Sequence, residues 1–282
     1  MAGHVLREAL VSEGHQVIGT SRYAKHFQDS EILRFDALEL DSWIPFFRSI
    51  RVDFVVNCIG VLVEASDRDP AKALTINTLL PKFLESFYSN SKTRVIHIST
   101  DCVFDGKKGK YHPKDTPTEK KTYGFTKALG EISNQKDLTI RTSIIGLELG
   151  DKPNSSENSG LLHWFLSRPQ GSTIKGFTNC FWSGISTLEL ADAVSWYIWH
   201  MSRNPLASGL FGIHQISRPC SISKFELLQI ASSVFGHHLE IVPCSAHKID
   251  KSMLSSPEAF QVNAGYRDML MRIARTRELN AG

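Results

Sequence analysis

The chain lacks the features that mark membrane, secreted and nucleic-acid-binding proteins. Its longest apolar run, residues 54–63 (FVVNCIGVLV), contains an asparagine and is far shorter than the roughly 20 residues of a membrane span. No charged segment followed by an apolar one opens the chain, so we expect no secretory signal. Basic residues exceed acidic ones by only 32 − 29 = 3, which does not indicate nucleic acid or a membrane as a partner.

Cysteine is scarce and irregularly spaced. The five cysteines are Cys58, Cys102, Cys180, Cys220 and Cys244. Their number is odd and no Cys-x-x-Cys occurs, which argues against a zinc or redox motif. The eleven histidines form no ligand pattern either, so no metal site is predicted. We expect free thiols in a reducing, cytoplasmic setting.

The chain also has no repeat or low-complexity segment, but helical and extended patterns alternate through its first half. Residues 4–14 and 120–135 have helical patterns, whereas 15–22, 52–60, 93–100 and 137–144 read as strands. Residues 70–90 read as a helix that is bent or broken near Pro81. This alternation predicts an α/β fold, a Rossmann-like doubly wound parallel sheet with helices on both faces.

The second half has a different character. A polar loop (147–160) is followed by an amphipathic helix from Thr187 to Arg203, and then by strand, helix and strand patterns. With 282 residues, the chain is long enough for a core domain and a smaller lobe. We therefore expect a dinucleotide-binding core of residues 1–145 with the 185–203 helix returning to it. Residues 146–184 and 204–282 would form a C-terminal substrate-binding lobe.

A sheet of this class opens with a strand and a glycine loop, and both are missing here. The sequence starts within the first helix, with Gly3 where the last glycine of a G-x-x-G-x-x-G loop would pack on the sheet. Because the first strand is central in the order 3-2-1-4-5-6, we expect a gap between the second and fourth strands of the full fold. A truncated gene model is our expectation; the alternative is a protein without a phosphate-binding loop. A stop codon directly upstream of Met1 would contradict truncation. We also expect the chain to bind dinucleotides weakly or not at all.

Tyr123 and Lys127 lie four positions apart, on one face of a predicted helix. A phenol with a pKa of about 10 exchanges protons poorly at neutral pH, and a neighbouring ammonium lowers that pKa. The pair could then act as a general acid or base toward a carbonyl or alcohol oxygen. An exposed tyrosine beside a solvated lysine is the alternative. Thr100 ends an apolar strand, where ligands bind in open α/β sheets, and this context favours the catalytic interpretation.

The segments around these residues resemble one protein family. Ser99 to Gly106 (STDCVFDG) and Tyr123 to Glu131 (YGFTKALGE) are similar to the S-T-D-x-V-F-x-G and Y-G-x-[ST]-K-x-x-G-E patterns of the dTDP-4-dehydrorhamnose reductase family. That RmlD-like family belongs to the extended short-chain dehydrogenase/reductase superfamily. The resemblance extends, more loosely, from the first helix to about Pro243.

The resemblance implies a catalytic set of Thr100, Tyr123 and Lys127. Tyr123 would protonate a C4 keto oxygen as hydride arrives from a nicotinamide, and Thr100 would polarise that oxygen. Lys127 would lower the pKa of Tyr123 and hold the nicotinamide ribose. Asn77 matches the asparagine that organises a proton relay in the superfamily; a helix-interior asparagine with a local bond is the alternative.

On the cofactor side, the resemblance implies NADPH or NADH. Ser21 and Arg22, after the second strand, would suit the 2′-phosphate of NADPH, unless Arg22 is simply solvated. Asp36 matches an adenine-contacting position. The further cofactor candidates are Gly3, Cys58, Ile59, Gly60 and Ser99. Turn chemistry explains Gly60 equally well.

On the substrate side, the resemblance implies a nucleotide-activated deoxysugar. The candidates are Val63, Glu64, Val103, Phe104, Ser143, Trp182 and Ser183. Ile144 stands where the family has tryptophan, which leaves the sugar open, and core packing is the alternative for Trp182.

We therefore predict an NAD(P)H-dependent reductase of a 4-keto-deoxysugar nucleotide. It would act in the biosynthesis of dTDP-rhamnose or another polysaccharide precursor. We expect no nucleic-acid or membrane partner, and a homodimer is compatible with this prediction. Dehydration is disfavoured because Cys102 replaces the glutamate that follows Asp in dehydratases. An epimerase of the same superfamily stays open. So does a non-catalytic subunit like the regulatory subunit of methionine adenosyltransferase, although the intact Thr100, Tyr123 and Lys127 argue against it.

Overall fold

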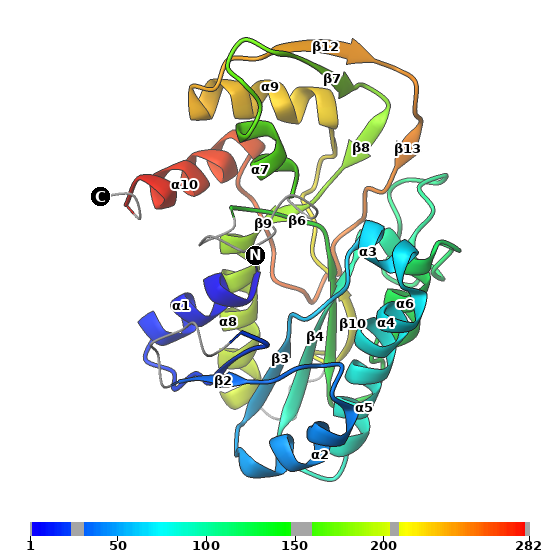
Figure 1. Cartoon of the computed structure of the whole chain (residues 1–282), viewed down its shortest axis with the longest axis vertical. Coiled ribbons are helices and arrows are strands. Elements are labelled where there is room, and N and C mark those ends of the chain that lie inside the picture. The colour runs from blue at the N-terminus through cyan, green and yellow to red at the C-terminus, as the bar shows by residue number, and fades with distance from the viewer. Residues whose placement is uncertain (1, 24–30, 148–159, 204–208, 280–282) are drawn as a thin grey trace.

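The computed structural model describes residues 2–23, 31–147, 160–203 and 209–279, and the side chains of all but the last two of these. A parallel sheet with helices on both faces forms the larger part of the molecule (Figure 1). The polar loop predicted at 147–160 lies, apart from its two end residues, outside the described residues.

The central sheet has four parallel strands in the order β10-β5-β4-β3. Their bounds are β3 Phe54–Asn57, β4 Arg94–Thr100, β5 Leu138–Thr142 and β10 Gly212–Gln215. These are apolar runs rich in β-branched residues, as expected for strands covered on both faces. The predicted α/β fold class is confirmed.

Two further strands lie apart from this sheet. β1 (Gly19–Ser21) and β2 (Ile32–Arg34) are parallel and form a sheet of their own. In the part of the chain that the structure describes, hydrogen bonds do not join this pair to β3. This is the position of the expected gap, and the strand predicted over residues 15–22 shrinks to three residues.

Helices cover the two faces of the central sheet (Figure 1). α1 (Ala2–Ser12) and α8 (Thr187–Arg203) pack on one face, where Ile96, Ile140 and Val194 are fully buried. The opposite face is covered by α2 (Leu40–Ser49), α4 (Pro70–Leu74) and α5 (Leu80–Phe87), which bury Trp43, Leu84 and Val95. α2 was not predicted from the sequence.

The helix predicted over residues 70–90 is interrupted, as expected, but in an unforeseen way. A π-helical segment, η2 (Thr75–Leu79), separates α4 from α5, and Pro81 lies in the first turn of α5. Proline is tolerated there because a first-turn amide has no partner within the helix. π-Helical turns occur frequently at functional sites.

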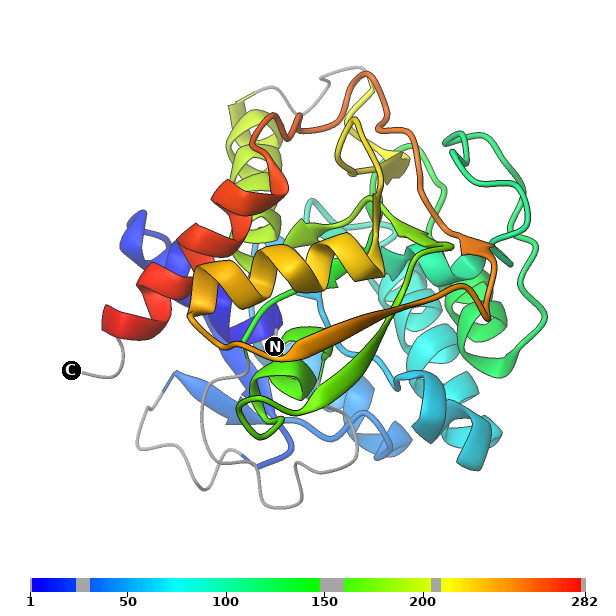
Figure 2. The same cartoon turned by 90° about the horizontal axis from the view of Figure 1, so that it is seen from above.

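The smaller lobe lies beyond the carboxyl ends of the central strands (Figure 1). Seen from above, its helix α9 and strand β12 lie across the middle of the view (Figure 2). Its helices are α7 (Leu161–Leu166), α9 (Lys224–Phe235) and α10 (Tyr266–Leu279). Its strands are β7 (Thr173–Phe177), β8 (Cys180–Trp182), β11 (Ile222–Ser223), β12 (Glu240–Cys244) and β13 (Ile249–Asp250).

The structure divides the chain differently from the predicted boundaries at one point. β10 falls within 204–282, which we assigned to the lobe, yet it extends the central sheet by pairing with β5. Ala259 and Val262 also pack in the core cluster with α1 and α8. Residues beyond 203 therefore contribute to both parts.

Candidate active site

Tyr123 and Lys127 lie on helix α6 (Thr122–Gly130), which approaches neighbouring backbone closely at two glycines. A Cβ added at Gly124 would lie 2.0 Å from the carbonyl oxygen of Cys102, and one at Gly130 would lie 2.0 Å from that of Asn77. Only glycine fits such distances. The two glycines of the Y-G-x-T-K-x-x-G segment therefore hold α6 against the carboxyl end of β4 and against η2.

Glu131, which ends the same motif, fastens α6 to the central sheet. It forms a bidentate ion pair with Arg141 of β5, with two N···O distances of 2.7 Å, and both side chains are buried. Ser99 of β4 donates a third hydrogen bond to it, at 2.8 Å. The structure thus places the Ser99 hydroxyl in this network, and its assignment as a cofactor contact stays untested.

Thr100 ends β4 and joins Tyr123 in one polar cluster. The Thr100 hydroxyl donates to Asp101 Oδ1 at 3.1 Å and accepts the backbone N–H of Cys102 at 3.1 Å. Burial and the nearby Cys102 and Asp101 raise the pKa of the Tyr123 phenol, although Thr100 opposes this. Tyr123 is therefore protonated at neutral pH.

Lys127 is buried and faces the sheet. Its Nζ donates to the carbonyl oxygen of Ile98 at 2.7 Å and lies 3.2 Å from Nε2 of His97. We expected Lys127 to lower the pKa of Tyr123. In this structure the pKa of Tyr123 is raised and Lys127 is not among its causes, so that expectation is not met. The polar contacts of the Lys127 amino group are with His97 and Ile98 of β4 instead.

A charged group that the sequence did not indicate lies beside this cluster. Lys251 follows β13 of the lobe, and its Nζ is 3.5 Å from a carboxylate oxygen of Glu119. Burial raises the pKa of the Asp101 carboxyl, although Lys251 and hydrogen bonds from Ser143 and Thr100 oppose this. Burial lowers the pKa of Lys251, but Cys102, Asp101 and Glu119 together leave it raised. No sequence signal marks Lys251, because it lies 132 residues from Glu119 and still further from Asp101 and Cys102.

The Asn77 side chain is hydrogen-bonded to Val61 and Thr126. Its side chain accepts the N–H of Val61 at 2.9 Å and donates to the Val61 carbonyl oxygen and to Thr126 Oγ1, each at 3.1 Å. All its side-chain atoms are thus engaged in tying η2 to α6 and to the loop after β3. These contacts agree with the alternative of a structural asparagine; the relay role is untested.

The candidates near β1 and β2 are more exposed. Ser21 Oγ accepts the N–H of Tyr23, and the Arg22 guanidinium lies 5.0 Å from the centre of the Tyr23 ring. Asp36 Oδ1 accepts the N–H of Leu38 in a local turn. These positions follow the carboxyl ends of two parallel strands, where a dinucleotide binds in this class of fold.

Cys58, Ile59 and Gly60 follow β3, with Gly3 of α1 close by. A Cβ added at Gly3 would lie 4.0 Å from that of Cys58, and one at Gly60 would lie 3.5 Å from Asn77 Oδ1, both ordinary contact distances. Neither position needs glycine for space in this structure. Burial raises the pKa of the Cys58 thiol to about 11, so it is uncharged.

Of the substrate-side candidates, Val63 and Glu64 are accessible. Both lie in the first turn of α3 (Val63–Arg68) and are exposed, so a ligand can reach them. Ser143 is half-buried between the two parts of the molecule. Its Oγ accepts the indole N–H of Trp182 at 2.8 Å and is also hydrogen-bonded to Asp101.

Val103 and Phe104 require a correction. Both side chains are 0% exposed, and Phe104 stacks on Tyr111 with 4.1 Å between ring centres. They form a small core cluster with Met253 and offer no side-chain surface to a sugar.

Trp182 and Ser183 are likewise buried. Trp182 packs in the lobe core, as the alternative expectation had it, and Ser183 Oγ accepts the N–H of Met253 at 2.9 Å. As substrate contacts they stay untested, and a ligand would reach them only after these contacts rearrange.

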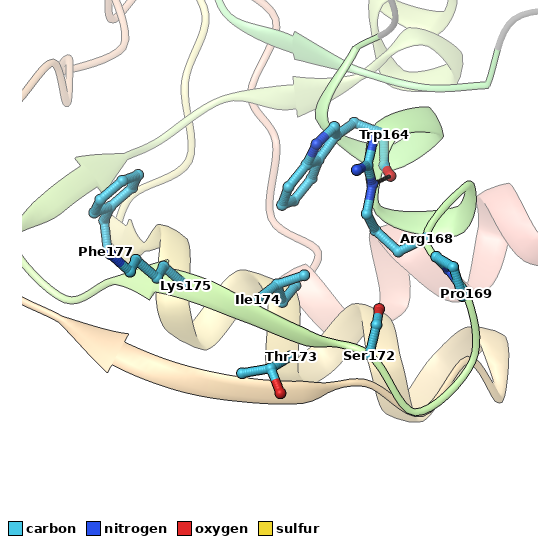
Figure 3. A pocket seen from close by; sticks show the side chains of 8 residues that line it. All are labelled: Trp164, Arg168, Pro169, Ser172, Thr173, Ile174, Lys175 and Phe177. Atoms are coloured by element: carbon cyan, nitrogen blue, oxygen red, sulfur yellow. Dashed lines mark hydrogen bonds between the residues drawn. The ribbon is translucent and has the colours of Figure 1, made fainter.

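The lobe has a pocket of its own, of about 490 Å³, between α7 and β7 (Figure 3). Arg168 lies against the ring of Trp164, with 5.3 Å from the guanidinium carbon to the ring centre. The remaining lining residues are Pro169, Ser172, Thr173, Ile174, Lys175 and Phe177. None of the predicted site residues lines it, and it contains no acid–base pair that could perform the predicted chemistry.

Neither a metal-binding cluster nor a membrane-spanning helix occurs among the described residues. Among these residues, no group of three or more His, Cys, Asp or Glu side chains is arranged to hold a metal ion. None of the helices in the described ranges is long and apolar enough to span a bilayer. All five cysteines are free thiols.

The fold and the Tyr123/Lys127 helix together define a member of the short-chain dehydrogenase/reductase superfamily. Known proteins agree: a family model described as the RmlD substrate binding domain matches residues 1–151. The probable low-salt glycan biosynthesis reductase Agl14 of Haloferax volcanii is 28% identical over 207 residues, 68% of each chain.

Solved structures are similar over nearly the whole chain. A hypothetical dTDP-4-dehydrorhamnose reductase from Sulfolobus tokodaii has a TM-score of 0.74 at 24% identity and covers 94% of each chain. A dTDP-4-dehydrorhamnose reductase from Bacillus anthracis, solved in complex with NADP, has a TM-score of 0.71 at 18% identity and covers 89% of this chain and 93% of its own.

This chain belongs to the RmlD substrate binding domain family, since the family model matches more than half of it. The predicted family and fold class are confirmed. The predicted class of enzyme, an oxidoreductase, and the predicted nicotinamide cofactor agree with these relatives.

Proposed function

We propose that this protein reduces the 4-keto group of a nucleotide-activated deoxysugar with NAD(P)H. The observation that carries the proposal is that Tyr123 lies beside Thr100 at the carboxyl end of β4, with Lys127 one turn further along α6. Family membership and the names of the relatives support the substrate class.

The protonation of Tyr123 suits the reductive direction. Reduction of a ketone leaves an oxyanion that needs a proton, and a phenol that is uncharged at neutral pH can donate one. Thr100 now donates to Asp101, so it must rotate its hydroxyl proton toward the substrate oxygen to polarise it. Asp101 would then accept one bond fewer, which its raised pKa tolerates.

The residues after β1, β2 and β3 fit a nicotinamide dinucleotide in part. Arg22 is exposed and can pair with a 2′-phosphate, and Gly60 leaves the end of β3 open. When bound, the cofactor supplies the hydride. The chain's own task there is to hold the ribose near Lys127 and the sugar ketone near Tyr123.

The substrate would lie between α3 and the lobe. Val63 and Glu64 are exposed on α3, and Ser143 and Lys251 approach the same polar cluster from the lobe side. We further propose, from the five free thiols, that the enzyme works in the cytoplasm. A homodimer stays a prediction that sedimentation would check.

The test follows NADPH absorbance with a dTDP-4-keto-6-deoxysugar and identifies the product by mass spectrometry. It compares the chain with a form extended by a strand and a glycine loop. We expect turnover at least in the extended form, and a loss of roughly 10²–10⁴-fold in Tyr123→Phe, because the general acid is removed. Tyr88→Phe is the matched control, since its buried hydroxyl has no hydrogen-bond partner among the described residues.

Other outcomes distinguish the alternatives. Full activity in Tyr123→Phe would refute the proposed mechanism. Conversion of an unoxidised nucleotide sugar to its C4 epimer, with no net use of NADPH, would identify an epimerase. Absence of turnover in both forms, together with tight binding to a partner protein, would identify a non-catalytic subunit.

A further inference from the structure

Three buried polar side chains form a row across β3, β4 and α6. Asn57 ends β3 and is paired in register with His97 of β4, and its Nδ2 lies 3.2 Å from His97 Nδ1. On the other side of the ring, His97 Nε2 lies 3.2 Å from Lys127 Nζ. His97 is 0% exposed and its two neighbours are 4% exposed. Because these side chains are buried, their hydrogen-bond donors and acceptors must find partners within the protein.

The orientation of the Asn57 amide is fixed by a neighbour. The backbone N–H of Ile59 donates to Asn57 Oδ1 at 3.1 Å, which turns the NH₂ group of the amide toward His97. His97 Nδ1 must then be an acceptor. A neutral imidazole carries its proton on the other nitrogen, so Nε2 is the donor.

The donor at Nε2 determines what Lys127 can be. An ammonium has three donors and no lone pair, so it cannot accept a hydrogen bond from Nε2–H. A neutral amine can accept that bond and still donate to the Ile98 carbonyl oxygen at 2.7 Å. The geometry therefore suits an uncharged Lys127.

The surrounding charges agree with this assignment. Burial lowers the pKa of Lys127 to about 8, against the opposing effects of Glu131 on α6 and Cys58 after β3. Burial, Lys127 and Lys82 of α5 hold the pKa of His97 well below its usual value. His97 is therefore neutral at neutral pH, and Lys127 loses its proton above a pH of about 8.

We propose that Asn57 and His97 are positioning residues that set the protonation state of Lys127. Net uptake of one proton by Lys127 requires Nε2 to become an acceptor. The His97 proton then moves to Nδ1, and the Asn57 amide turns its oxygen toward the ring. That turn releases the N–H of Ile59, a backbone donor in the segment proposed to contact the cofactor. The charge on Lys127 is thereby coupled to the cofactor-facing loop after β3. The catalytic meaning of this relay rests on the proposed function.

The test uses the full chain labelled with ¹⁵N, without substrate or cofactor. Long-range ¹H–¹⁵N spectra of the histidine rings report which nitrogen carries the proton, and His97→Gln identifies the His97 signals by their absence. We expect a neutral ring protonated on Nε2 at about pH 9.5, where Lys127 has lost its proton. A ring protonated on Nδ1 at that pH, or an imidazolium, would overturn the proposal.

The second measurement is the titration of Lys127 Nζ, assigned with Lys127→Met. In His97→Gln the carboxamide oxygen can accept from the ammonium, so we expect the pKa of Lys127 to rise by roughly one unit. In Asn57→Asp, a carboxylate opposite Nδ1 should place a proton on that nitrogen. An unchanged Lys127 titration in His97→Gln would contradict the relay. Because neither readout involves turnover, a failure of the proposed function would leave both results unchanged.

Discussion

The β4–α6 region and the β1–β2 region are held by different kinds of contact. In the first, a buried ion pair, a row of buried polar side chains and two close backbone approaches fix α6 against the sheet. In the second, two strands of three residues each carry half-buried or exposed side chains, and the hydrogen bonds of Ser21 and Asp36 are local. Tertiary packing thus fixes the positions of the proposed acid–base residues, whereas local contacts fix those of the proposed cofactor residues. Each prediction below tests one side of that difference.

The largest effect is expected for the buried ion pair. Arg141→Met leaves the Glu131 carboxylate buried without its guanidinium, and we expect a loss of about 3–5 kcal/mol in the free energy of unfolding. Urea denaturation at neutral pH measures it. Arg34→Met is the control in the second region: it breaks an exposed pair with Glu39, and we expect little change. Equal losses in both variants would remove the distinction between the regions.

Two helical glycines give the next comparison. In Gly130→Ala the new Cβ meets the backbone oxygen of Asn77 at 2.0 Å, so α6 must shift, and we expect a loss of about 1–3 kcal/mol. Gly3→Ala in α1 meets nothing closer than 4.0 Å, and we expect no loss. Thermal unfolding monitored by circular dichroism compares the two. An unaffected Gly130→Ala would show that the contact of α6 with η2 is loose.

The protonation of Lys127 predicts a pH dependence. Its pKa is about 8 in the folded protein against an ordinary 10.5, so between these values the unfolded chain binds a proton that the folded protein does not. Stability should therefore rise with pH across this window and be lowest below it.

Lys127→Met removes this contribution. We expect the stability of the wild type relative to Lys127→Met to increase by about 1–2 kcal/mol from neutral pH to pH 9.5, as measured by urea denaturation. The raised pKa values of the Cys58 and Cys102 thiols, about 11 and 12, weaken both proteins above pH 9. The effect of Cys102 cancels in the difference, whereas that of Cys58 cancels only in part, because Lys127 lowers the pKa of Cys58. A difference that stays constant with pH would mean that Lys127 is charged throughout.

The smallest effect is expected in the cofactor region. If Arg22 pairs with a 2′-phosphate, Arg22→Ala should weaken NADPH binding roughly tenfold and leave NADH binding unchanged. Calorimetric titration with each nucleotide measures both. Equal changes for the two nucleotides would show that Arg22 does not contact the 2′-phosphate.

Much of the fold was predictable because the spacing of apolar residues along a helix or strand follows from which of its faces is buried. The helix Thr187–Arg203 and the strand Arg94–Thr100 appear as expected, since their apolar patterns match the surfaces they bury. α2 was missed because Pro45 interrupts its pattern. The π-helix at Thr75–Leu79 was missed because it depends on Asn77 reaching Val61 and Thr126, contacts that local sequence does not show.

The candidate site was predictable only as a set of residues. The motif identified Thr100, Tyr123 and Lys127, and the structure gathers them beside β4. Val103 and Phe104, next to the same motif, turned out to be core because Tyr111 and Met253 close over them. His97 carried a signal that was overlooked: it is a polar residue in the middle of an apolar strand, and such a residue needs a buried partner.

The alternation of strands and helices follows from the sequence alone, as does the motif that places a phenol and an amine on one helix, because both depend on neighbours within a few residues. The orientation of the Lys127 amine and the protonation state that its partners favour depend on tertiary contacts. The groups that decide this, Asn57, His97 and Ile98, come from other strands, and burial strengthens their hydrogen bonds and excludes the water that would otherwise solvate a charge.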